Sequence, residues 1–263
     1  MMKIVVCVKQ VPDTTEIKID PVKNTLIRTG VPSILNPFDR NAVETALQLK
    51  DTYGASVTVL SMGPPQAKAV LREALSMGAD RAYLITDRAF GGSDTYATSY
   101  ILSSAIRHLG PFDVVLGGKQ AIDGDTGQTA PSIAEHLDMI RLTYIMSMEI
   151  EGDKVIAKRQ VEEGVEVIEA SLPVLCTATK ESNKPRYATI KGVLNSLKAE
   201  IGEITLASLP DSDTTKMGLK GSPTKVKATF TPKRNANCMN IEGNSPAETA
   251  GTLIDRLTEA KVL

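Results

Sequence analysis

Residues 113–137 read DVVLGGKQAIDGDTGQTAPSIAEHL, and this stretch decides the fold class that we predict. Its start, Asp113–Gly117, is a short β-branched and aliphatic run, which is typical of a strand buried on both faces. A polar, glycine-rich loop follows, and a helix is predicted from about Gly127 to Leu137. Strand, loop and helix in this order form the repeating unit of an α/β fold.

The same alternation extends towards the N-terminus. Asn36-Pro37-Phe38-Asp39 predicts a helix start, with Asn36 as the N-cap, proline at the first helical position and an acid in the first turn. Ser93 is interpreted as the N-cap of a later helix. The predicted strands are Lys3–Val8, Ser56–Ser61 and Ala82–Thr86, and the predicted helices begin after Asn36 and cover Pro65–Met77 and Asp94–Leu109.

This pattern predicts a doubly wound, mostly parallel sheet with right-handed crossovers. Ligands of such sheets bind at the carboxyl ends of the strands. Three loops are therefore candidates for a site, namely residues 9–15, 62–65 and 117–127.

The second half of the chain has a different pattern. Tyr144–Ile150, Lys154–Gln160 and Val165–Ala170 predict an antiparallel hairpin extension, and Leu172–Thr179 could return to the main sheet. Residues 200–245 are irregular, and Ser245-Pro246 begins a predicted amphipathic C-terminal helix. We therefore expect an α/β domain over 1–200, and an extended arm plus helix over 201–263 that packs on a partner.

Composition excludes several classes of function. The net charge is −1 and aromatic residues make up 4%, which argues against nucleic-acid binding. No apolar run approaches the ~20 residues that span a bilayer, and the N-terminus lacks a signal-peptide pattern, so we expect no membrane insertion and a cytoplasmic protein. Cys7, Cys176 and Cys238 are far apart, so neither a metal site nor an iron–sulfur cluster is predicted.

The loop at 117–129 has two interpretations. Its glycines allow a ligand to approach the backbone, and amides at a helix N-terminus suit a diphosphate. Asp123 and Asp125 could accept hydrogen bonds from ribose hydroxyls, while Gln128 and Thr129 could donate to phosphate. A polar turn without a ligand is the alternative, since the loop matches neither the dinucleotide-binding nor the P-loop pattern.

The loop after the first strand is a second candidate. Lys9 could neutralise a phosphate, and Asp13-Thr14 could bind a second ligand, although a plain turn fixed by Pro12 explains the pattern equally. Phe90-Gly91-Gly92-Ser93-Asp94 resembles the phosphate loop of PP-loop ATPases, but it does not follow the first strand. His108 and His136 lie near helix ends without partners for a triad, and we predict no catalytic side chain.

Several blocks together resemble the electron transfer flavoprotein beta subunit. They occur in the family's order and cover most of residues 3–200. The blocks are VKQVPD at 8–13, NPFD at 36–39 with Ala42-Val43-Glu44, Gly63-Pro64, ALSMGADR at 74–81, GKQAID at 118–123 and PRYAT at 185–189.

The resemblance implies an adenine-nucleotide-hydrolase-like fold and an alpha-subunit partner. Respiratory members hold AMP in this subunit, whereas electron-bifurcating members hold an FAD that takes a hydride from NADH. The runs VPDT at 11–14, GDTGQ at 124–128 and NIEG at 240–243 are similar to the bifurcating branch. In that branch the electrons go to ferredoxin or flavodoxin and, through the alpha-subunit FAD, to an acyl-CoA dehydrogenase-type flavoenzyme.

The resemblance also implies roles for individual residues. Pro12, Asp13 and Thr14 would lie near the NADH, and Arg186, Tyr187, Ile190 and Leu194 belong to the segment that docks the acceptor flavoenzyme. The residues that would bind FAD, or AMP in the alternative, are Cys7, Val8, Lys9, Asn36, Asp39, Met62, Gly118, Lys119, Gln120, Ala121, Ile122, Asp123, Gly124, Asp125, Thr126, Gly127, Gln128 and Thr129.

Three functions therefore remain open from the sequence. The first is a bifurcating beta subunit of an NADH-dependent flavoprotein complex, and the second is a respiratory-type subunit that holds AMP structurally. The third is a stand-alone nucleotide-binding module of the universal-stress type, in which the arm and the PRYAT segment would have no role. A PP-loop ligase is disfavoured by the position of its Gly-Gly-Ser-Asp run.

Overall fold

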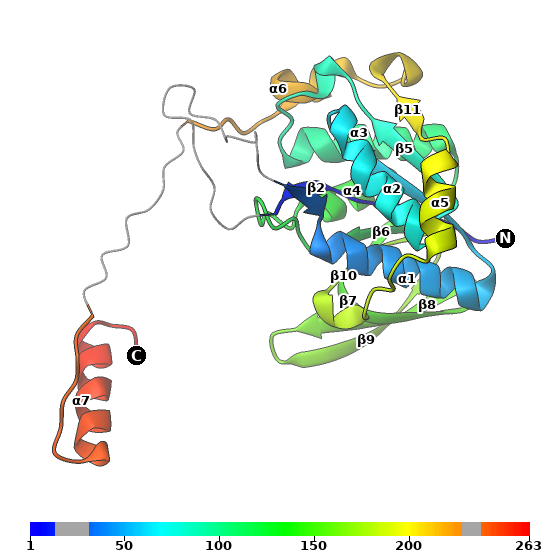
Figure 1. The fold of residues 1–263 in the computed structure, drawn as a ribbon. Helices are drawn as coiled ribbons and strands as arrows, with labels where there is room; N and C mark the ends of the chain where they lie inside the picture. Colours follow the sequence, from blue (N-terminus) through cyan, green and yellow to red (C-terminus); the bar gives the residue numbers. More distant parts are fainter. Residues whose placement is uncertain (14–31, 228–237) are drawn as a thin grey trace. The chain divides into compact units, whose positions relative to one another are not determined.

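The computed structural model describes residues 1–13, 32–227 and 238–263 (Figure 1). The chain divides into two units, Met1–Lys227 and Ala228–Leu263. The first unit extends beyond the predicted domain end at residue 200, because residues 202–204 form a strand of the main sheet. In the second unit, the predicted C-terminal helix is α7 (Pro246–Glu259), with Ser245 as its N-cap.

The described residues of the first unit form a nine-stranded sheet. Its order is β11-β5-β4-β1-β6-β10-β7-β8-β9. The pairings from β11 through to β7 are parallel, while β7, β8 and β9 are antiparallel, as the sequence predicts. The strands are β1 (Lys3–Cys7), β4 (Ser56–Met62), β5 (Arg81–Ile85), β6 (Val114–Gly118), β7 (Ile140–Glu151), β8 (Lys154–Val161), β9 (Gly164–Ser171), β10 (Val174–Ala178) and β11 (Gly202–Ile204).

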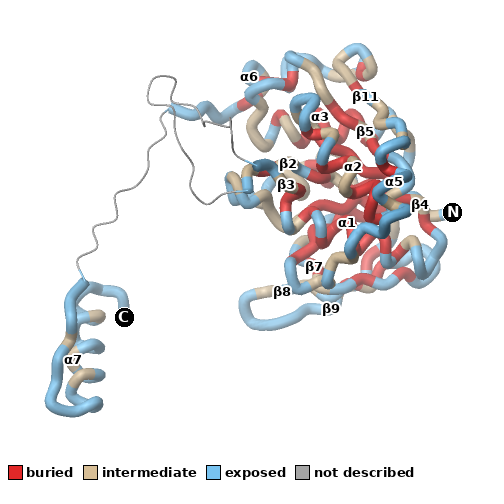
Figure 2. The backbone as a smooth tube through the Cα atoms, in the orientation of Figure 1, coloured by how far each residue is buried: buried red, intermediate tan, exposed pale blue. Residues whose placement is uncertain are grey.

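The helices pack on both faces of this sheet and enclose two cores. The central strands between the helices are buried (Figure 2). One core joins α1 and α2 to side chains such as Val6 and Val59, and the other joins α3 and α4 to side chains such as Val5 and Leu60. The doubly wound α/β architecture is confirmed. The helices of the first unit are α1 (Pro37–Tyr53), α2 (Lys68–Met77), α3 (Thr95–Leu109), α4 (Thr129–Leu137), α5 (Ile190–Lys198) and α6 (Gly218–Gly221).

The winding direction reverses at β1. From β1 the chain passes through α1 to β4 and then to β5, and α3 carries it back to β6 on the other side of β1. The carboxyl ends of β1 and β6 therefore flank the point at which ligands bind in open α/β sheets. Strand β2 (Gln10–Pro12) follows β1 directly and pairs antiparallel with β3 (Ser33–Leu35). This two-stranded pair is called the small hairpin.

One predicted helix cap is wrong. The Ser93 hydroxyl donates to the carbonyl of Phe90 over 2.8 Å and does not cap α3. Asp94 is the N-cap, since its carboxylate accepts the N–H of Ala97 over 3.0 Å. Both residue types favour this position, and the tight turn before α3 uses the hydroxyl elsewhere.

Among the described helices, none combines the length and the apolar character needed to cross a bilayer.

Candidate functional site

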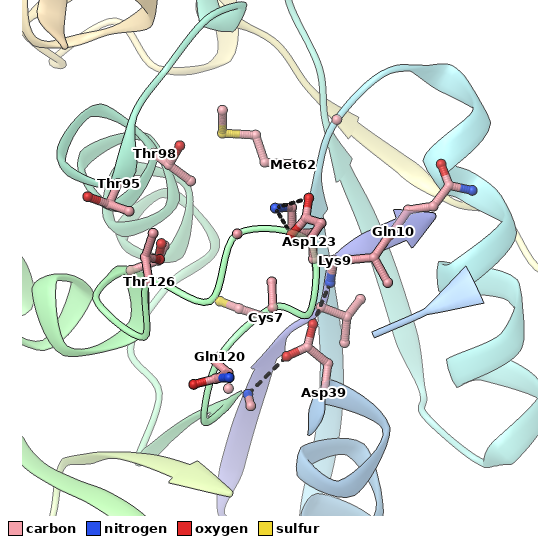
Figure 3. Close-up of a pocket in the computed structure, with 18 of the residues that line it drawn as sticks. Cys7, Lys9, Gln10, Asp39, Met62, Thr95, Thr98, Gln120, Asp123 and Thr126 are labelled. Atoms are coloured by element: carbon pink, nitrogen blue, oxygen red, sulfur yellow. Dashed lines mark hydrogen bonds and ion pairs between the residues drawn. The ribbon is translucent and has the colours of Figure 1, made fainter. Parts of the chain in front are cut away.

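A cavity of about 510 Å³ opens at the carboxyl ends of β1, β4 and β6 (Figure 3). Residues from the end of β1, the β6–α4 loop and the start of α3 meet around it. The predicted binding residues that line the cavity are Cys7, Val8, Lys9, Pro12, Asp39, Met62, Gly118, Lys119, Gln120, Ala121, Asp123, Gly124, Asp125, Thr126, Gly127, Gln128 and Thr129.

A buried carboxylate ties two of the lining segments together. Asp39, in the first turn of α1, accepts the backbone N–H of Lys9 over 2.7 Å and that of Gly118 over 3.0 Å. Gly118 must be glycine for this contact, because a Cβ there would lie 2.5 Å from Asp39 Oδ1. The end of β6 thus closes directly onto the helix start.

The same carboxylate has a perturbed acidity. Burial raises the pKa of Asp39 to about 7, against the opposing effects of its hydrogen bonds and of the Lys9 charge. Burial also raises the pKa of the neighbouring Cys7 thiol to about 12. Cys7 is therefore a neutral thiol at neutral pH and not a reactive nucleophile.

Asn36 is the N-cap residue of α1, but its side chain makes no capping bond. It donates instead to the carbonyl of Gln120 over 2.8 Å and accepts the N–H of Ile122 over 3.2 Å. Asn36 is fully buried and does not line the cavity. It supports the β6–α4 loop from behind, which differs from the capping role predicted for its side chain.

An ion pair crosses from the first loop to the β6–α4 loop. The Lys9 ammonium lies 2.7 Å from the carboxylate of Asp123, and the two side chains point at each other in Figure 3. Within the loop, Gln120 donates to Asp125 over 2.8 Å. Asp125 and Gly127 have positive φ angles of 49° and 61°, which fold the loop back on itself.

The loop ends in a run of free backbone amides. None of the backbone N–H groups of residues 126–130 donates a hydrogen bond to any residue that the structure describes. All five residues line the cavity, and the run leads into the first turn of α4. Such a cluster at a helix N-terminus is suited to bind an anion, above all a phosphate group.

The same β6–α4 loop begins with a lysine, Lys119. Its ammonium lies 5.1 Å from the centre of the Tyr144 ring. Lys119 lines the cavity, and its N–H donates to Ala178 at the end of β10 over 2.9 Å. The carboxyl groups of four aspartates also line the cavity, and Asp123 pairs with Lys9. The groups that favour a negatively charged part of a ligand are therefore the run of amides and Lys119, which has no salt bridge within the described residues.

Several predicted residues lie outside the cavity lining. Ile122 is 40% exposed, Asp13 does not line the cavity, and Thr14 lies outside the described residues. Among the predicted docking residues, Tyr187 and Ile190 are almost fully exposed and Leu194 is 56% exposed. The Arg186 side chain binds Glu44 and Asp51 of α1. The binding roles of all these residues remain predictions.

The cavity has walls that sequence reasoning did not identify. Thr95 and Thr98 of α3 project toward the cavity in Figure 3, and Ser33 of β3 lines it as well. Gln10, which also lines it, belongs to the predicted candidate loop at 9–15. The rule that ligands bind at carboxyl ends of strands would have identified α3, because its N-terminus follows β5. Ser33 has no such signal, since its position depends on pairing with Pro12.

No group of three or more His, Cys, Asp or Glu residues within the described ranges is placed to hold a metal ion. The absence of a metal site stays a prediction.

Comparisons with known proteins agree on one family. The model for the electron transfer flavoprotein domain matches residues 23–209. The electron transfer flavoprotein subunit beta of Thermoanaerobacterium thermosaccharolyticum is 52% identical over 262 residues and 100% of both chains. The caffeyl-CoA reductase-Etf complex subunit CarD of Acetobacterium woodii is 48% identical over 266 residues and 100% of both chains. The protein FixA of Azorhizobium caulinodans is 44% identical over 260 residues, 96% of this chain and 92% of that one.

Proposed function

This chain belongs to the electron transfer flavoprotein family as a beta subunit, and on that premise we propose that its cavity holds FAD that is reduced by NADH. Membership implies an alpha-subunit partner and a role in electron transfer. The proposal adds the identity of the nucleotide, the electron donor and the splitting of the electrons between two acceptors.

The run of free amides at residues 126–130 carries this proposal. A diphosphate needs several donors in a small volume, and consecutive amides at a helix start supply them without a cost in side-chain entropy. Lys119 adds charge, and the hydroxyls of Thr126 and Thr129 lie on the same stretch. The donor set therefore fits the diphosphate of a flavin adenine dinucleotide.

The extent of the cavity favours FAD over AMP. From the amide run it continues to Gln10, Pro12 and Ser33 of the small hairpin and to Met62 after β4. Its volume of about 510 Å³ lies within the range of small-molecule sites. AMP would occupy the part near the amides and leave the hairpin side without a ligand. Pro12 and its neighbours Asp13 and Thr14 are the residues that we propose for NADH.

Bound FAD would supply the redox chemistry, namely acceptance of a hydride from NADH and delivery of single electrons to ferredoxin or flavodoxin and to the alpha-subunit FAD. The chain's own residues position and shield the cofactor. Asp39 fixes the distance between the two loops, and Lys9 with Asp123 spans the gap between them. Cys7 presents a neutral, polarizable thiol to the cavity.

We further propose that the surface of α5 docks the acceptor flavoenzyme. Helix α5 carries four exposed apolar residues, namely Ile190, Val193, Leu194 and Leu197. Ile190 is 84% exposed and Leu197 is 63% exposed, and apolar residues grouped on a surface in this way are typical of an interaction site. The Acetobacterium relative is named as a subunit of a caffeyl-CoA reductase-Etf complex. An acyl-CoA dehydrogenase-type partner is therefore our proposal for this chain.

The second unit is proposed to bind the alpha subunit. No residue of α7 is buried, although Leu253 and Ile254 are apolar and about half exposed. A helix with an apolar stripe needs a surface to cover it. We place the resulting complex in the cytoplasm.

Purification of this chain together with its alpha subunit tests the proposal. We expect two FAD and no AMP per heterodimer after denaturation and nucleotide analysis, and bleaching of the flavin spectrum by NADH. One FAD with one AMP, and no response to NADH, would overturn the FAD assignment and leave the respiratory type. Stability of the chain alone, with no complex formed, would favour a stand-alone module.

A further inference from the structure

Tyr144 has a backbone conformation that its residue type disfavours. Its φ angle is +60° although it lies within β7, and large aromatic residues rarely adopt the left-handed region. Near Tyr144 the pairing of β7 is irregular with both neighbouring strands. Its register shifts against β10 between Cys176 and Ala178, and against β8 between Ile145 and Ser147.

The end of β10 holds this conformation in place. The N–H of Tyr144 donates to the hydroxyl of Thr177 over 2.9 Å. The next carbonyl, that of Ile145, accepts both the N–H and the hydroxyl of Thr179, over 3.1 and 3.3 Å. A bulge that re-aims one side chain is a typical use of such irregularities beside functional sites.

The redirected side chain meets a lysine of the cavity. Lys119 Nζ lies 5.1 Å from the centre of the Tyr144 ring, within the range of a cation–π interaction. Lys119 forms no salt bridge with any carboxylate of the described residues, in contrast to Lys9, which pairs with Asp123.

The two lysines are thus held in different ways. A carboxylate orients an ammonium but also neutralises it, so Lys9 has much of its charge already compensated. An aromatic face orients an ammonium and leaves its full positive charge available to a ligand. The pair at Tyr144 therefore suits a lysine whose task is to meet an anion.

We propose that Tyr144 is a positioning residue that holds the Lys119 ammonium toward the phosphate-bearing part of the bound nucleotide. This inference rests on one part of the proposed function, namely that the cavity binds an adenine nucleotide that carries phosphate. Tyr144 itself does not line the cavity, and it acts through Lys119.

Four variants of the heterodimer with its alpha subunit, three single and one double, test the role of Tyr144. Tyr144→Asn removes the ring, and asparagine tolerates a positive φ angle, so the bulge is retained. Tyr144→Phe keeps the ring and removes only the hydroxyl, and is the matched control. Lys119→Met removes the charge, and the double variant Lys119→Met/Tyr144→Asn measures the coupling between the two sites.

The readout is nucleotide affinity after removal of the bound nucleotide, with FAD and AMP as parallel probes at low and high salt. We expect Tyr144→Asn to weaken binding by about three- to fivefold at low salt, and by less at high salt. Tyr144→Phe should bind as the wild type does. In the Lys119→Met background, adding Tyr144→Asn should change nothing further.

Two results would overturn the positioning role. One is a loss of affinity in Tyr144→Asn that persists undiminished in the Lys119→Met background. The other is an equal loss in Tyr144→Phe. Neither result depends on which nucleotide is native, because both probes carry phosphate. A preference for AMP over FAD would overturn the FAD assignment alone, so the two failures are distinguishable.

Discussion

Arg186 donates two hydrogen bonds from its guanidinium to the carboxylate of Glu44, over 2.9 and 3.0 Å. The backbone N–H of Arg186 donates to the same carboxylate over 3.0 Å. Glu44 lies on α1 with only 5% of its side chain exposed, whereas Arg186 lies in the segment that leads to α5. One helix therefore carries both a wall of the cavity, at Asp39, and the anchor of the proposed docking segment.

This anchor predicts a large effect on stability. Arg186→Ala leaves the buried Glu44 carboxylate without its partner, and we expect a loss of about 3 kcal/mol in the free energy of unfolding. Arg186→Lys should recover part of this, because an ammonium keeps the charge but not the forked geometry. Urea unfolding measures both.

Arg141→Ala is the control for the anchor, since Arg141 pairs with Glu135 on the surface and both side chains are more than half exposed. Exposed pairs contribute about 0–1 kcal/mol. Equal losses in Arg141→Ala and Arg186→Ala would contradict the importance of burial at Glu44.

Two glycines of the same loop should respond differently to alanine. At Gly118 a Cβ would lie 2.5 Å from Asp39 Oδ1 and 2.7 Å from the Asp39 nitrogen, so the helix start must move away. We expect Gly118→Ala to cost about 2 kcal/mol and to reduce cofactor retention. Gly124 has no atom within 4 Å of the same position, and Gly124→Ala should change stability by less than about 0.5 kcal/mol.

Thermal unfolding and nucleotide content of the two alanine variants give the comparison. A Gly118→Ala protein that retains its nucleotide and its melting temperature would show that the contact between Gly118 and Asp39 is not needed.

Asp39 predicts a dependence of stability on pH. Its pKa of about 7 in the folded chain lies above the value of 3.8 for an ordinary aspartate, so the folded state keeps a proton that the unfolded state releases. The contribution of Asp39 to the free energy of unfolding is therefore fully present below about pH 4, and it is lost as the pH rises to about 7. The loss amounts to at most about 4 kcal/mol.

Asp39→Asn should remove this dependence, because the amide does not titrate. The free energy of unfolding of both proteins is measured in urea from pH 4 to pH 8. As the pH rises, the wild type should lose stability relative to Asp39→Asn. A difference that is constant over this range, or that moves the other way, would contradict a raised pKa.

The sequence predicted the alternating strands and helices because their signals are local. Periodic apolar residues, Pro37 at a helix start and Ser245 as an N-cap each act within a few positions. Asn36 was placed correctly as the residue before α1, but its side chain bonds to a loop more than eighty positions away. No local pattern distinguishes a capping asparagine from one that supports a distant loop.

The remaining errors have the same physical origin. The strand β11 has three residues, and it exists because β5 offers an open edge beside it. Tyr144 lies in a run that reads as an ordinary strand, and its left-handed backbone depends on Thr177 in another strand. Pairing between distant segments therefore determines both β11 and the backbone of Tyr144, and the strand propensity of the local residues cannot predict either.

The exposed apolar residues of α5 give the last prediction. Ile190 is 84% exposed, and a central apolar anchor of an interface commonly costs a factor of ten or more in affinity when it is lost. Ile190→Asp should therefore raise the concentration of acceptor flavoenzyme needed for half-maximal electron transfer by about tenfold. The flavin content and the response to NADH should not change, because Ile190 does not line the cavity.

Leu219→Asp is the matched control for this experiment, since Leu219 is also apolar and 61% exposed but lies on α6. We expect normal electron transfer from it. Steady-state rates at a series of acceptor concentrations separate docking from electron transfer itself, because a docking defect is overcome at high acceptor concentration and a slower transfer step is not. An unchanged rate in Ile190→Asp would place the docking surface elsewhere on the complex. An equal loss in both variants would mean that added negative charge, and not the apolar face of α5, determines the effect.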